Sequence, residues 1–216
     1  MVNQILSSIE GTRVVAIVRK IYGDDLVHLA EALLEGGIRN IEVTFDQADP
    51  DGIRRTSEAI ATLNTRFGGE MYAGAGTVVT HEQLIAASNS GACYIISPNT
   101  DVEIIRKTKN LGLVSIPGAT TPTEIMTAYK AGADIVKLFP ASELGTGYIK
   151  SIRAPLNHIK LMATGGVNEL NFEDFIRAGC IGAGIGGNLA DAALVAAGDF
   201  LEITRRARLY KLGSDI

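Results

Sequence analysis

The sequence predicts an α/β protein, a parallel (β/α)8 TIM barrel that forms one domain over residues 1–216. Short runs rich in Val and Ile alternate with longer segments of helical period, and this alternation repeats eight times along the chain. No linker, low-complexity tract or block of charge interrupts it. Eight units in about 200 residues agree with the lower size limit of this fold. An open, doubly wound sheet uses the same alternation, but eight strands favour a closed barrel.

The eight apolar runs are the expected strands of the barrel. They lie at residues 14–19, 39–45, 71–78, 93–98, 113–118, 134–139, 160–164 and 181–185. In the helix after the first strand, we expect Asp24 and Asp25 to form the N-cap and the Gly36-Gly37 pair to end the helix. Later helices are expected to begin at or near Thr80, Asp101 and Pro122 and to end at Gly91, Gly112, Gly132 and Gly179.

Composition and charge exclude several functional classes. The chain has 24 acidic and 20 basic residues, a net charge of −4 and no Trp, so nothing attracts nucleic acid or anionic lipid. No basic region precedes the first apolar residues, and no run approaches about 18 apolar residues, so we expect neither export nor a membrane span. Cys93 and Cys180 cannot form a disulfide framework or a zinc site, which fits a reducing cytoplasm. The basic run at 205–211 fits the solvated face of a terminal helix.

Two predicted strands carry an ionisable residue where a barrel of this kind builds its active site, at the carboxyl ends of the strands. Alternation along 41–45 places Glu42 on the face opposite Ile41 and Val43, and therefore inside the barrel. The same argument places Lys137 and Phe139 inside.

A buried lysine has two interpretations. In the structural interpretation, Lys137 extends from a strand end to pair with an acid, or is simply exposed because no closed barrel forms. In the functional one, it is an amine nucleophile that forms a Schiff base with a carbonyl. Burial lowers a lysine pKa and thereby raises the fraction of neutral, reactive amine, while an ionised Glu42 nearby would oppose that change. Glu42 itself either holds an inward cation or works as a general acid and base.

Two glycine-rich turns follow the last two strands, at 164–168 and 184–188. Parallel barrels commonly bind phosphate there through backbone N–H groups, although tight turning alone also explains the glycines. A Gly-x-Gly-x-x-Gly match at 182–187 has no following strand-helix unit, so a dinucleotide site is rejected. The remaining strand ends add Arg19, a fork for a carboxylate or phosphate or else a surface ion pair, and Thr77, a ligand hydroxyl or a helix cap.

These motifs resemble, across nearly the whole chain, the bacterial 2-keto-3-deoxy-6-phosphogluconate (KDPG) and 4-hydroxy-2-oxoglutarate (KHG) aldolase family. The matching segments, in the order of the family, are 41–44, 74–78, 97–99, 117–124, 136–141 and 163–167. The resemblance implies a trimeric, cytoplasmic, Schiff-base aldolase of Entner–Doudoroff-type sugar metabolism. Such an enzyme acts on a small keto-acid substrate and needs no metal or organic cofactor.

By position, the resemblance makes Lys137 the Schiff-base lysine and Glu42 the residue that transfers protons. The same comparison gives the substrate-binding residues. The residues expected to line the pyruvoyl pocket are Thr77, Pro98 and Phe139, and those expected to hold the phosphate are Gly165, Gly166 and Gly187.

The sequence departs from the family pattern at two positions. Gluconate-type members usually have an arginine for the substrate carboxylate where this chain has Asp46. The 6-phosphogalactonate branch also lacks that arginine and keeps one at the place of Arg19, so Arg19 is the candidate ligand for the carboxylate. Asn188 stands where many members present a serine to the phosphate, and an amide can donate in its place. The acidic segment 46–52 lacks the ligand spacing of a calcium loop and is expected to be a helix-entry turn.

The expected reaction is reversible cleavage of a 2-keto-3-deoxy-6-phospho sugar acid, or of 4-hydroxy-2-oxoglutarate, to pyruvate and an aldehyde. The aldehyde would be, for example, glyceraldehyde 3-phosphate or glyoxylate. Two alternatives stay open at this point: a phosphosugar isomerase or epimerase with Glu42 as its base, and a keto-acid binder without catalysis.

Overall fold

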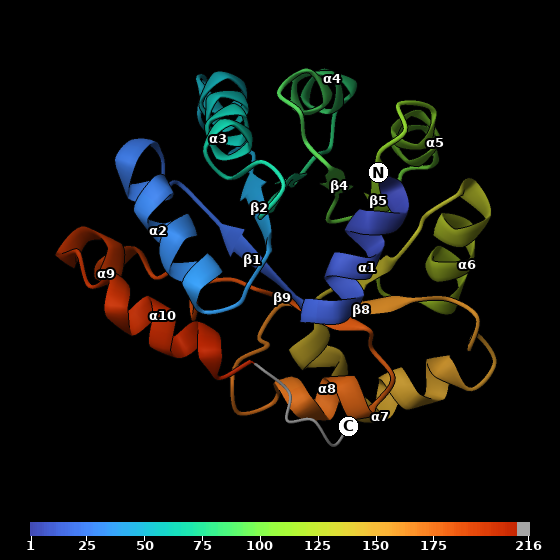
Figure 1. Cartoon of the computed structure of the whole chain (residues 1–216). Helices are drawn as coiled ribbons and strands as arrows, with labels where there is room; N and C mark the ends of the chain where they lie inside the picture. The colour runs from blue at the N-terminus through green and yellow to red at the C-terminus, as the bar shows by residue number, and fades with distance from the viewer. Residues whose placement is uncertain (211–216) are drawn as a thin grey trace.

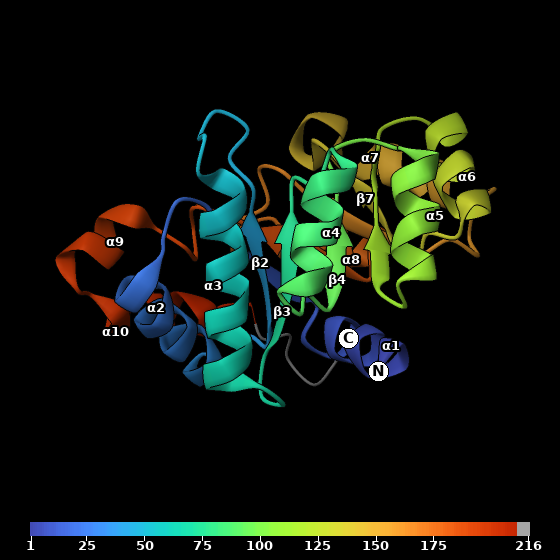
Figure 2. The ribbon, with the colours of Figure 1, turned by 90° about the horizontal axis from the view of Figure 1, so that it is seen from above.

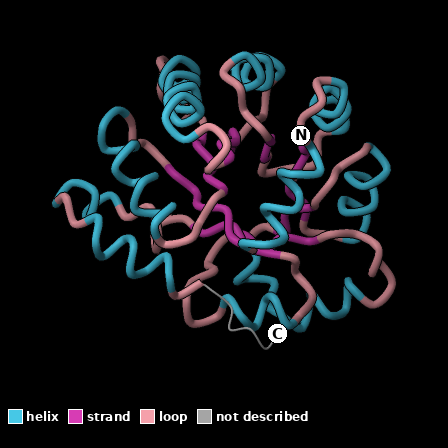
Figure 3. The backbone as a smooth tube through the Cα atoms, viewed as in Figure 1, coloured by secondary structure: helices cyan, strands magenta, loops and turns pink. Residues whose placement is uncertain are grey.

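The computed structural model describes residues 1–210 as a barrel of parallel strands surrounded by helices (Figures 1 and 3). The strands are β1 (Val14–Val18), β2 (Asn40–Thr44), β3 (Tyr72–Gly76), β4 (Tyr94–Ile96), β5 (Val114–Ile116), β6 (Gly118–Ala119), β7 (Val136–Leu138), β8 (Leu161–Thr164) and β9 (Gly182–Ile185). Their order in the sheet is β5-β4-β3-β2-β1-β9-β8-β7-β6, and every pair is parallel. The predicted fold is confirmed.

The prediction of eight strands was wrong by one, because Pro117 divides the fifth expected strand into β5 and β6. Proline has no N–H to donate to a neighbouring strand. The Pro117 carbonyl still accepts a hydrogen bond from Lys137 N (2.9 Å), and Ile116 O accepts one from Ser97 N (3.3 Å). The carbonyls of Ile116 and Pro117 therefore bond to the chain on opposite sides, one next to β4 and the other on β7, and the ring of strands closes there.

Apart from α1, which precedes β1, the helices follow the strands and form the outer layer (Figure 2). They are α1 (Val2–Thr12), α2 (Gly23–Glu35), α3 (Gly52–Phe67), α4 (His81–Asn89), α5 (Val102–Asn110), α6 (Pro122–Ala131), α7 (Ala141–Arg153), α8 (Phe172–Arg177), α9 (Ala192–Ala197) and α10 (Phe200–Arg208). No helix within residues 1–210 is both long and apolar enough to cross a lipid bilayer.

Most of the predicted helix ends are confirmed. Thr80 and Asp101 are N-caps whose side chains accept backbone N–H bonds, and Pro122 begins α6 after the Thr121 cap. The four glycines expected to end helices all adopt φ between +74° and +108°. The N-cap predicted at Asp24 and Asp25 was wrong: α2 begins at Gly23, so the two carboxylates lie within its first turn, where the helix dipole favours them.

The barrel has two apolar cores. One lies between the strands and the surrounding helices. The smaller one, the interior core, fills the inside of the barrel toward the amino-terminal ends of its strands. It consists of Ile5, Ile9, Val15, Tyr94, Ile96, Val114, Ile116, Ile135 and Met162. Ile5 and Ile9 come from α1, which lies across the amino-terminal end of the barrel (Figure 1). An ion pair from Lys160 to Glu10 ties α1 to the segment before β8. Because this end is closed, the interior is accessible from the carboxyl ends of the strands.

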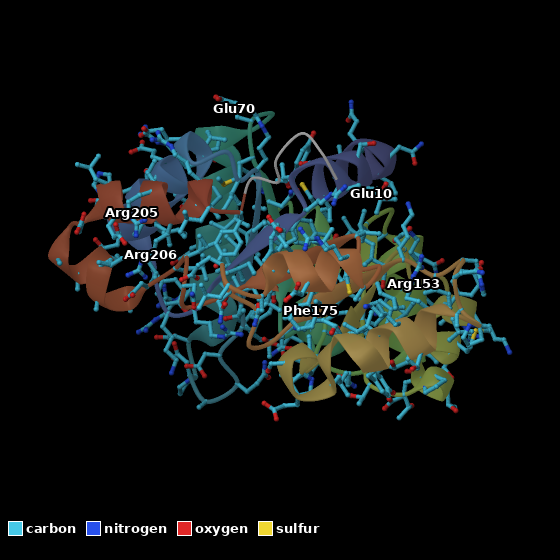
Figure 4. The ribbon with its side chains drawn as sticks, turned by 90° about the horizontal axis from the view of Figure 1, so that it is seen from below. Glu10, Glu70, Arg153, Phe175, Arg205 and Arg206 are labelled. Atoms are coloured by element: carbon cyan, nitrogen blue, oxygen red, sulfur yellow. The ribbon has the colours of Figure 1, made fainter. Side chains whose placement is uncertain are left out.

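The remaining surface predictions concern the carboxyl-terminal helix and the cysteines. Figure 4 shows Arg205 and Arg206 on α10. Arg205 pairs with Glu202 (2.6 Å) and Arg206 with Asp191 (3.1 Å), as expected for a solvated face, while Lys211 lies outside the described residues. Cys93 and Cys180 are both free thiols.

Candidate active site

Glu42 lies inside the barrel, as its alternation along β2 predicts. Its side chain is 1% exposed, whereas Ile41 and Val43 belong to the core beneath the helices. The carboxylate fits against Gly76 of the adjacent strand: a Cβ at position 76 would lie 2.5 Å from Glu42 Cγ and closer still to Oε1. Glu42 Oε2 is buried without a hydrogen-bond partner among residues 1–210. An unsatisfied buried carboxylate oxygen is costly, and a proton, a water molecule or a bound substrate would satisfy it.

Lys137 also lies inside, on β7. Its side chain is 6% exposed, and its neighbours Val136 and Leu138 face the helices. The Nζ atom lies 5.1 Å from the centroid of the Phe139 ring. No N···O contact within 4.0 Å joins Lys137 to a carboxylate among residues 1–210, so the amine is buried without a direct ion pair.

Burial acts on both charged groups in the direction that suits proton transfer. It raises the pKa of Glu42, while the positive charges of Lys137 and Arg19 oppose that rise. Burial also lowers the pKa of Lys137; the Glu42 charge opposes this change and the Arg19 charge adds to it. The amine is therefore more often neutral, and hence more nucleophilic, than a lysine in water.

Tyr94 is a residue of this interior that sequence analysis did not identify. Its ring is fully buried below Glu42 and occupies the space that Gly74 leaves, since a Cβ at position 74 would lie 2.6 Å from Tyr94 Cζ. The Tyr94 hydroxyl donates to Ile41 O (2.7 Å). The Gly-Ala-Gly sequence at 74–76 was the available signal, because two glycines on one face of a strand leave room for two larger side chains.

A cavity of about 220 Å³ opens at the carboxyl ends of β1, β8 and β9. It contains six of the predicted binding residues: Arg19, Phe139, Gly165, Gly166, Gly187 and Asn188. The N–H groups of Gly165, Gly166 and Gly187 have no hydrogen-bond partner among residues 1–210. Four larger cavities, of about 240 to 490 Å³, lie elsewhere on the described part of the chain, two of them near α1, and contain none of the predicted site residues.

Two polar side chains at this cavity differ in their partners: Asn188 is hydrogen-bonded and Arg19 has no ion pair among the described residues. Arg19 is exposed and makes no ion pair among the described residues; its Nη1 would lie 3.0 Å from a Cβ at Gly186. Asn188 does not point freely into the cavity, because its Nδ2 donates to Glu169 Oε2 (2.7 Å). Glu169 was not identified from the sequence. Arg19 is thus the unpaired cation beside a set of unpaired backbone donors.

Two further predicted residues follow β3 and β4 at the same end of the barrel. Thr77 has a φ of +57°, which is unusual for a β-branched residue, and Pro98 is half-buried. Neither lines the 220 Å³ cavity. Asp46, at the position of the missing family arginine, pairs with Lys20 (2.8 Å), and this hydrogen bond to Lys20 lowers the pKa of Asp46.

The segment 46–52 forms the turn into α3, as expected. Its remaining acids pair with arginines of that helix: Asp49 with Arg55 and Asp51 with Arg54, each at 3.3 Å. Within residues 1–210, no group of three or more His, Cys, Asp or Glu side chains is arranged to hold a metal ion.

The chain is similar to known proteins over most of its length. Residues 5–206 match the family model described as "Aldolase: KDPG and KHG aldolase". The 2-dehydro-3-deoxy-6-phosphogalactonate aldolase of Escherichia coli K12 is 35% identical over 176 residues, which are 81% of this chain and 83% of that protein. A solved structure described as native KDPGal is 32% identical, covers 91% of each chain and has a TM-score of 0.82.

A second solved structure is a KDPG aldolase from Legionella pneumophila, determined with pyruvate captured as a covalent carbinolamine intermediate. It is 26% identical to this chain, covers 95% of this chain and 97% of its own, and has a TM-score of 0.85.

Proposed function

The chain belongs to the KDPG and KHG aldolase family and is therefore a lyase, and we propose that it is a class I aldolase whose Schiff-base residue is Lys137. One observation carries the proposal: an amine that is 6% exposed and a carboxylate that is 1% exposed share the barrel interior without forming a direct ion pair. If the two groups served only as a structural ion pair, the Lys137 nitrogen and a Glu42 oxygen would be in direct contact. The covalent pyruvate adduct of the Legionella relative supports the same chemistry.

In the proposed reaction, the neutral Lys137 amine adds to the C2 carbonyl of the substrate to form a carbinolamine. Protonated Glu42 then gives its proton to the carbinolamine hydroxyl, which leaves as water and produces an iminium ion. Glu42, directly or through a water molecule, removes the proton of the C4 hydroxyl. The C3–C4 bond then breaks, the aldehyde departs, and the electron pair moves into the iminium to form an enamine. Glu42 returns the proton to C3. Hydrolysis of the new iminium releases pyruvate and restores the amine.

The raised pKa of Glu42 suits both of its proposed tasks. A carboxylate with an ordinary pKa is a weak base for a hydroxyl proton, whereas burial makes it a stronger one. The same protonated group is then a ready donor to the enamine carbon. Phe139 contributes an aromatic wall beside the amine, because its ring centroid lies 5.1 Å from Lys137 Nζ.

We propose that the substrate is a 2-keto-3-deoxy-6-phospho sugar acid. The unpaired N–H groups of Gly165, Gly166 and Gly187, with the Arg19 guanidinium beside them, suit a phosphate at the far end of the substrate. Arg19 lines this cavity, so in the proposal it serves the phosphate in addition to, or in place of, the substrate carboxylate. Asn188 would reach the phosphate after releasing Glu169.

We further propose that the protein works in the cytoplasm and assembles as a homotrimer. Free thiols at Cys93 and Cys180 suit the reducing cytoplasm. The family resemblance suggests a homotrimer, for which light scattering should give about three times the 22.8 kDa chain mass.

The test combines covalent trapping with turnover. Pyruvate and borohydride should add a reduced pyruvate group to Lys137 of the wild-type protein. The variant Lys150→Met, which lacks an exposed lysine, is the control and should be labelled at Lys137 to the same extent. Lys137→Met should remain unlabelled. Pyruvate release should be assayed in parallel with the two C4-epimeric phosphosugar acids and with 4-hydroxy-2-oxoglutarate. Full activity of Lys137→Met, or turnover without an adduct, would contradict the mechanism. An adduct without turnover of either phosphosugar acid would contradict the substrate class.

A further inference from the structure

Thr77 has a conformation that its surroundings must maintain. Its φ of +57° lies in the left-handed region, where the side chain of a β-branched residue crowds its own backbone. The backbone on both sides is anchored to neighbouring strands. Gly76 O accepts a hydrogen bond from Phe45 N (2.9 Å), and Val78 N donates to Ile96 O (3.1 Å). The turn at Thr77 redirects the chain between these anchors.

The carbonyl of Thr77 is held by two glutamine side chains in series. Gln47, in the loop between β2 and α3, donates its Nε2 to Thr77 O (3.0 Å). Gln83, in the first turn of α4, donates its Nε2 to Gln47 Oε1 (2.8 Å). These two hydrogen bonds connect two consecutive strand-helix units, β2-α3 and β3-α4, at the mouth of the barrel.

Gln83 also determines which way both amides face. Its Oε1 accepts from Val79 N (2.8 Å) and Thr80 N (3.2 Å), and its side chain is buried at 5% exposure. Because the oxygen is occupied by two N–H donors, the NH2 group must point to Gln47. Gln47 must then accept with its oxygen and present its own NH2 to the Thr77 carbonyl.

The N–H and Oγ1 of Thr77 have no hydrogen-bond partner in the described part of the chain. Both groups therefore remain available to an acceptor at the mouth of the barrel, next to Gly76 and the Glu42 carboxylate. We propose that Gln47 and Gln83 are positioning residues: their amide relay holds the Thr77 backbone in the conformation that presents its N–H and hydroxyl to the carboxylate of the bound keto acid. This inference rests on the proposed function.

The sharpest test exchanges one NH2 group for an oxygen. Gln83→Glu keeps an acceptor for Val79 N and Thr80 N but loses the donor to Gln47, so the Gln47 amide turns its NH2 toward the glutamate and its oxygen toward Thr77 O. Gln47→Leu removes the relay without a new charge. Gln4→Glu, on the exposed face of α1 at the opposite end of the barrel, introduces the same chemical change as a control.

The readout is the pyruvate concentration that half-saturates borohydride trapping at Lys137. We expect it to rise about three- to tenfold in Gln83→Glu and in Gln47→Leu, the range of one net hydrogen bond, while the trapping rate at saturation changes less than about twofold. The double variant should be no worse than the single ones, because both changes break one relay. Gln4→Glu should match the wild type.

An unchanged half-saturation in both relay variants would overturn the inference. So would a lower saturating rate and melting temperature without a change in half-saturation, which would indicate a structural role only. If the wild-type protein traps no pyruvate, the proposed function fails. The relay is then judged by hydrogen exchange at the Val78 amide in the free protein, which donates to Ile96 O directly after the Thr77 turn. Exchange there should be faster in Gln47→Leu than in Gln4→Glu; equal rates would refute the inference.

Discussion

Gly76 leaves the space that the carboxylate of Glu42 occupies. The two residues come from neighbouring strands, and a Cβ at position 76 would lie 2.5 Å from Glu42 Cγ and would overlap Oε1. The same strand carries Gly74, which leaves the space for the Tyr94 ring beneath. Two absent side chains on β3 thus determine where an acid and an aromatic ring sit inside the barrel.

This relationship predicts the effect of adding one methyl group. Gly76→Ala should displace the Glu42 carboxylate, lower the rate of aldol cleavage by about 10²-fold or more, and destabilise the fold by about 1–3 kcal/mol. Gly11→Ala on α1 is the matched control, because a Cβ there would meet no atom within 4 Å. Steady-state pyruvate release and urea unfolding measure the two effects. Wild-type activity in Gly76→Ala would show that the carboxylate position does not matter.

The raised pKa of Glu42 predicts how stability depends on pH. A carboxyl group whose pKa is higher in the folded than in the unfolded protein stabilises the fold below its unfolded value of 4.5, and this contribution is lost as the pH rises through the folded value. Urea unfolding should therefore show the wild type losing stability relative to Glu42→Gln as the pH rises from 4.5, by about 1.4 kcal/mol for each unit of pKa separation.

The control for this measurement is Glu58→Gln, which removes an exposed carboxylate paired with Arg54. It should change stability by less than about 0.5 kcal/mol. A difference between wild type and Glu42→Gln that stays constant over this pH range would contradict the prediction.

The lowered pKa of Lys137 predicts the pH profile of pyruvate trapping. The trapping rate at saturating pyruvate should rise with pH with a midpoint below 10.5, because burial disfavours the ammonium form. Glu42→Gln should move the midpoint further down, since the Glu42 charge raises the lysine pKa. Arg19→Gln should move it up, since the arginine charge lowers it. Shifts of the opposite sign would refute the electrostatic description of the site.

Asp134 predicts a stability effect that is independent of catalysis. Its carboxylate accepts hydrogen bonds from Lys109 Nζ (2.6 Å) and from Ser115 N (2.8 Å), and it is only partly exposed. Asp134→Ala removes both hydrogen bonds and leaves Lys109 Nζ only its 3.3 Å bond to Leu113 O, so it should destabilise the protein by about 1–3 kcal/mol. Glu58→Ala breaks an exposed pair with Arg54 and should cost about 0.5 kcal/mol or less. Equal losses in chemical denaturation would count against this account.

Local signals predicted most of the fold because they act over a few residues. The Thr80 and Asp101 caps and the glycines that end helices satisfy backbone groups within one turn, so their effect is visible in the sequence. The interruption at Pro117 was also encoded locally, by a residue without an N–H, but the run of apolar residues around it concealed the break. The N-cap was predicted wrongly at Asp24 and Asp25 because acidic residues are favourable both at the N-cap and in the first turn of a helix, and the sequence does not distinguish the two positions.

The site divides in the same way. By itself, the sequence determined which side of its strand each residue faces, since alternation along a strand is a local property; Glu42 and Lys137 are inside for that reason. Only the tertiary structure decided which residues meet, because contacts between strands depend on register and barrel closure. The fit of Glu42 against Gly76, the Tyr94 ring under it, the placement of Arg19 beside the glycine turns and the hold of Gln47 on Thr77 all join segments that are distant in sequence, and no local pattern specifies their separation.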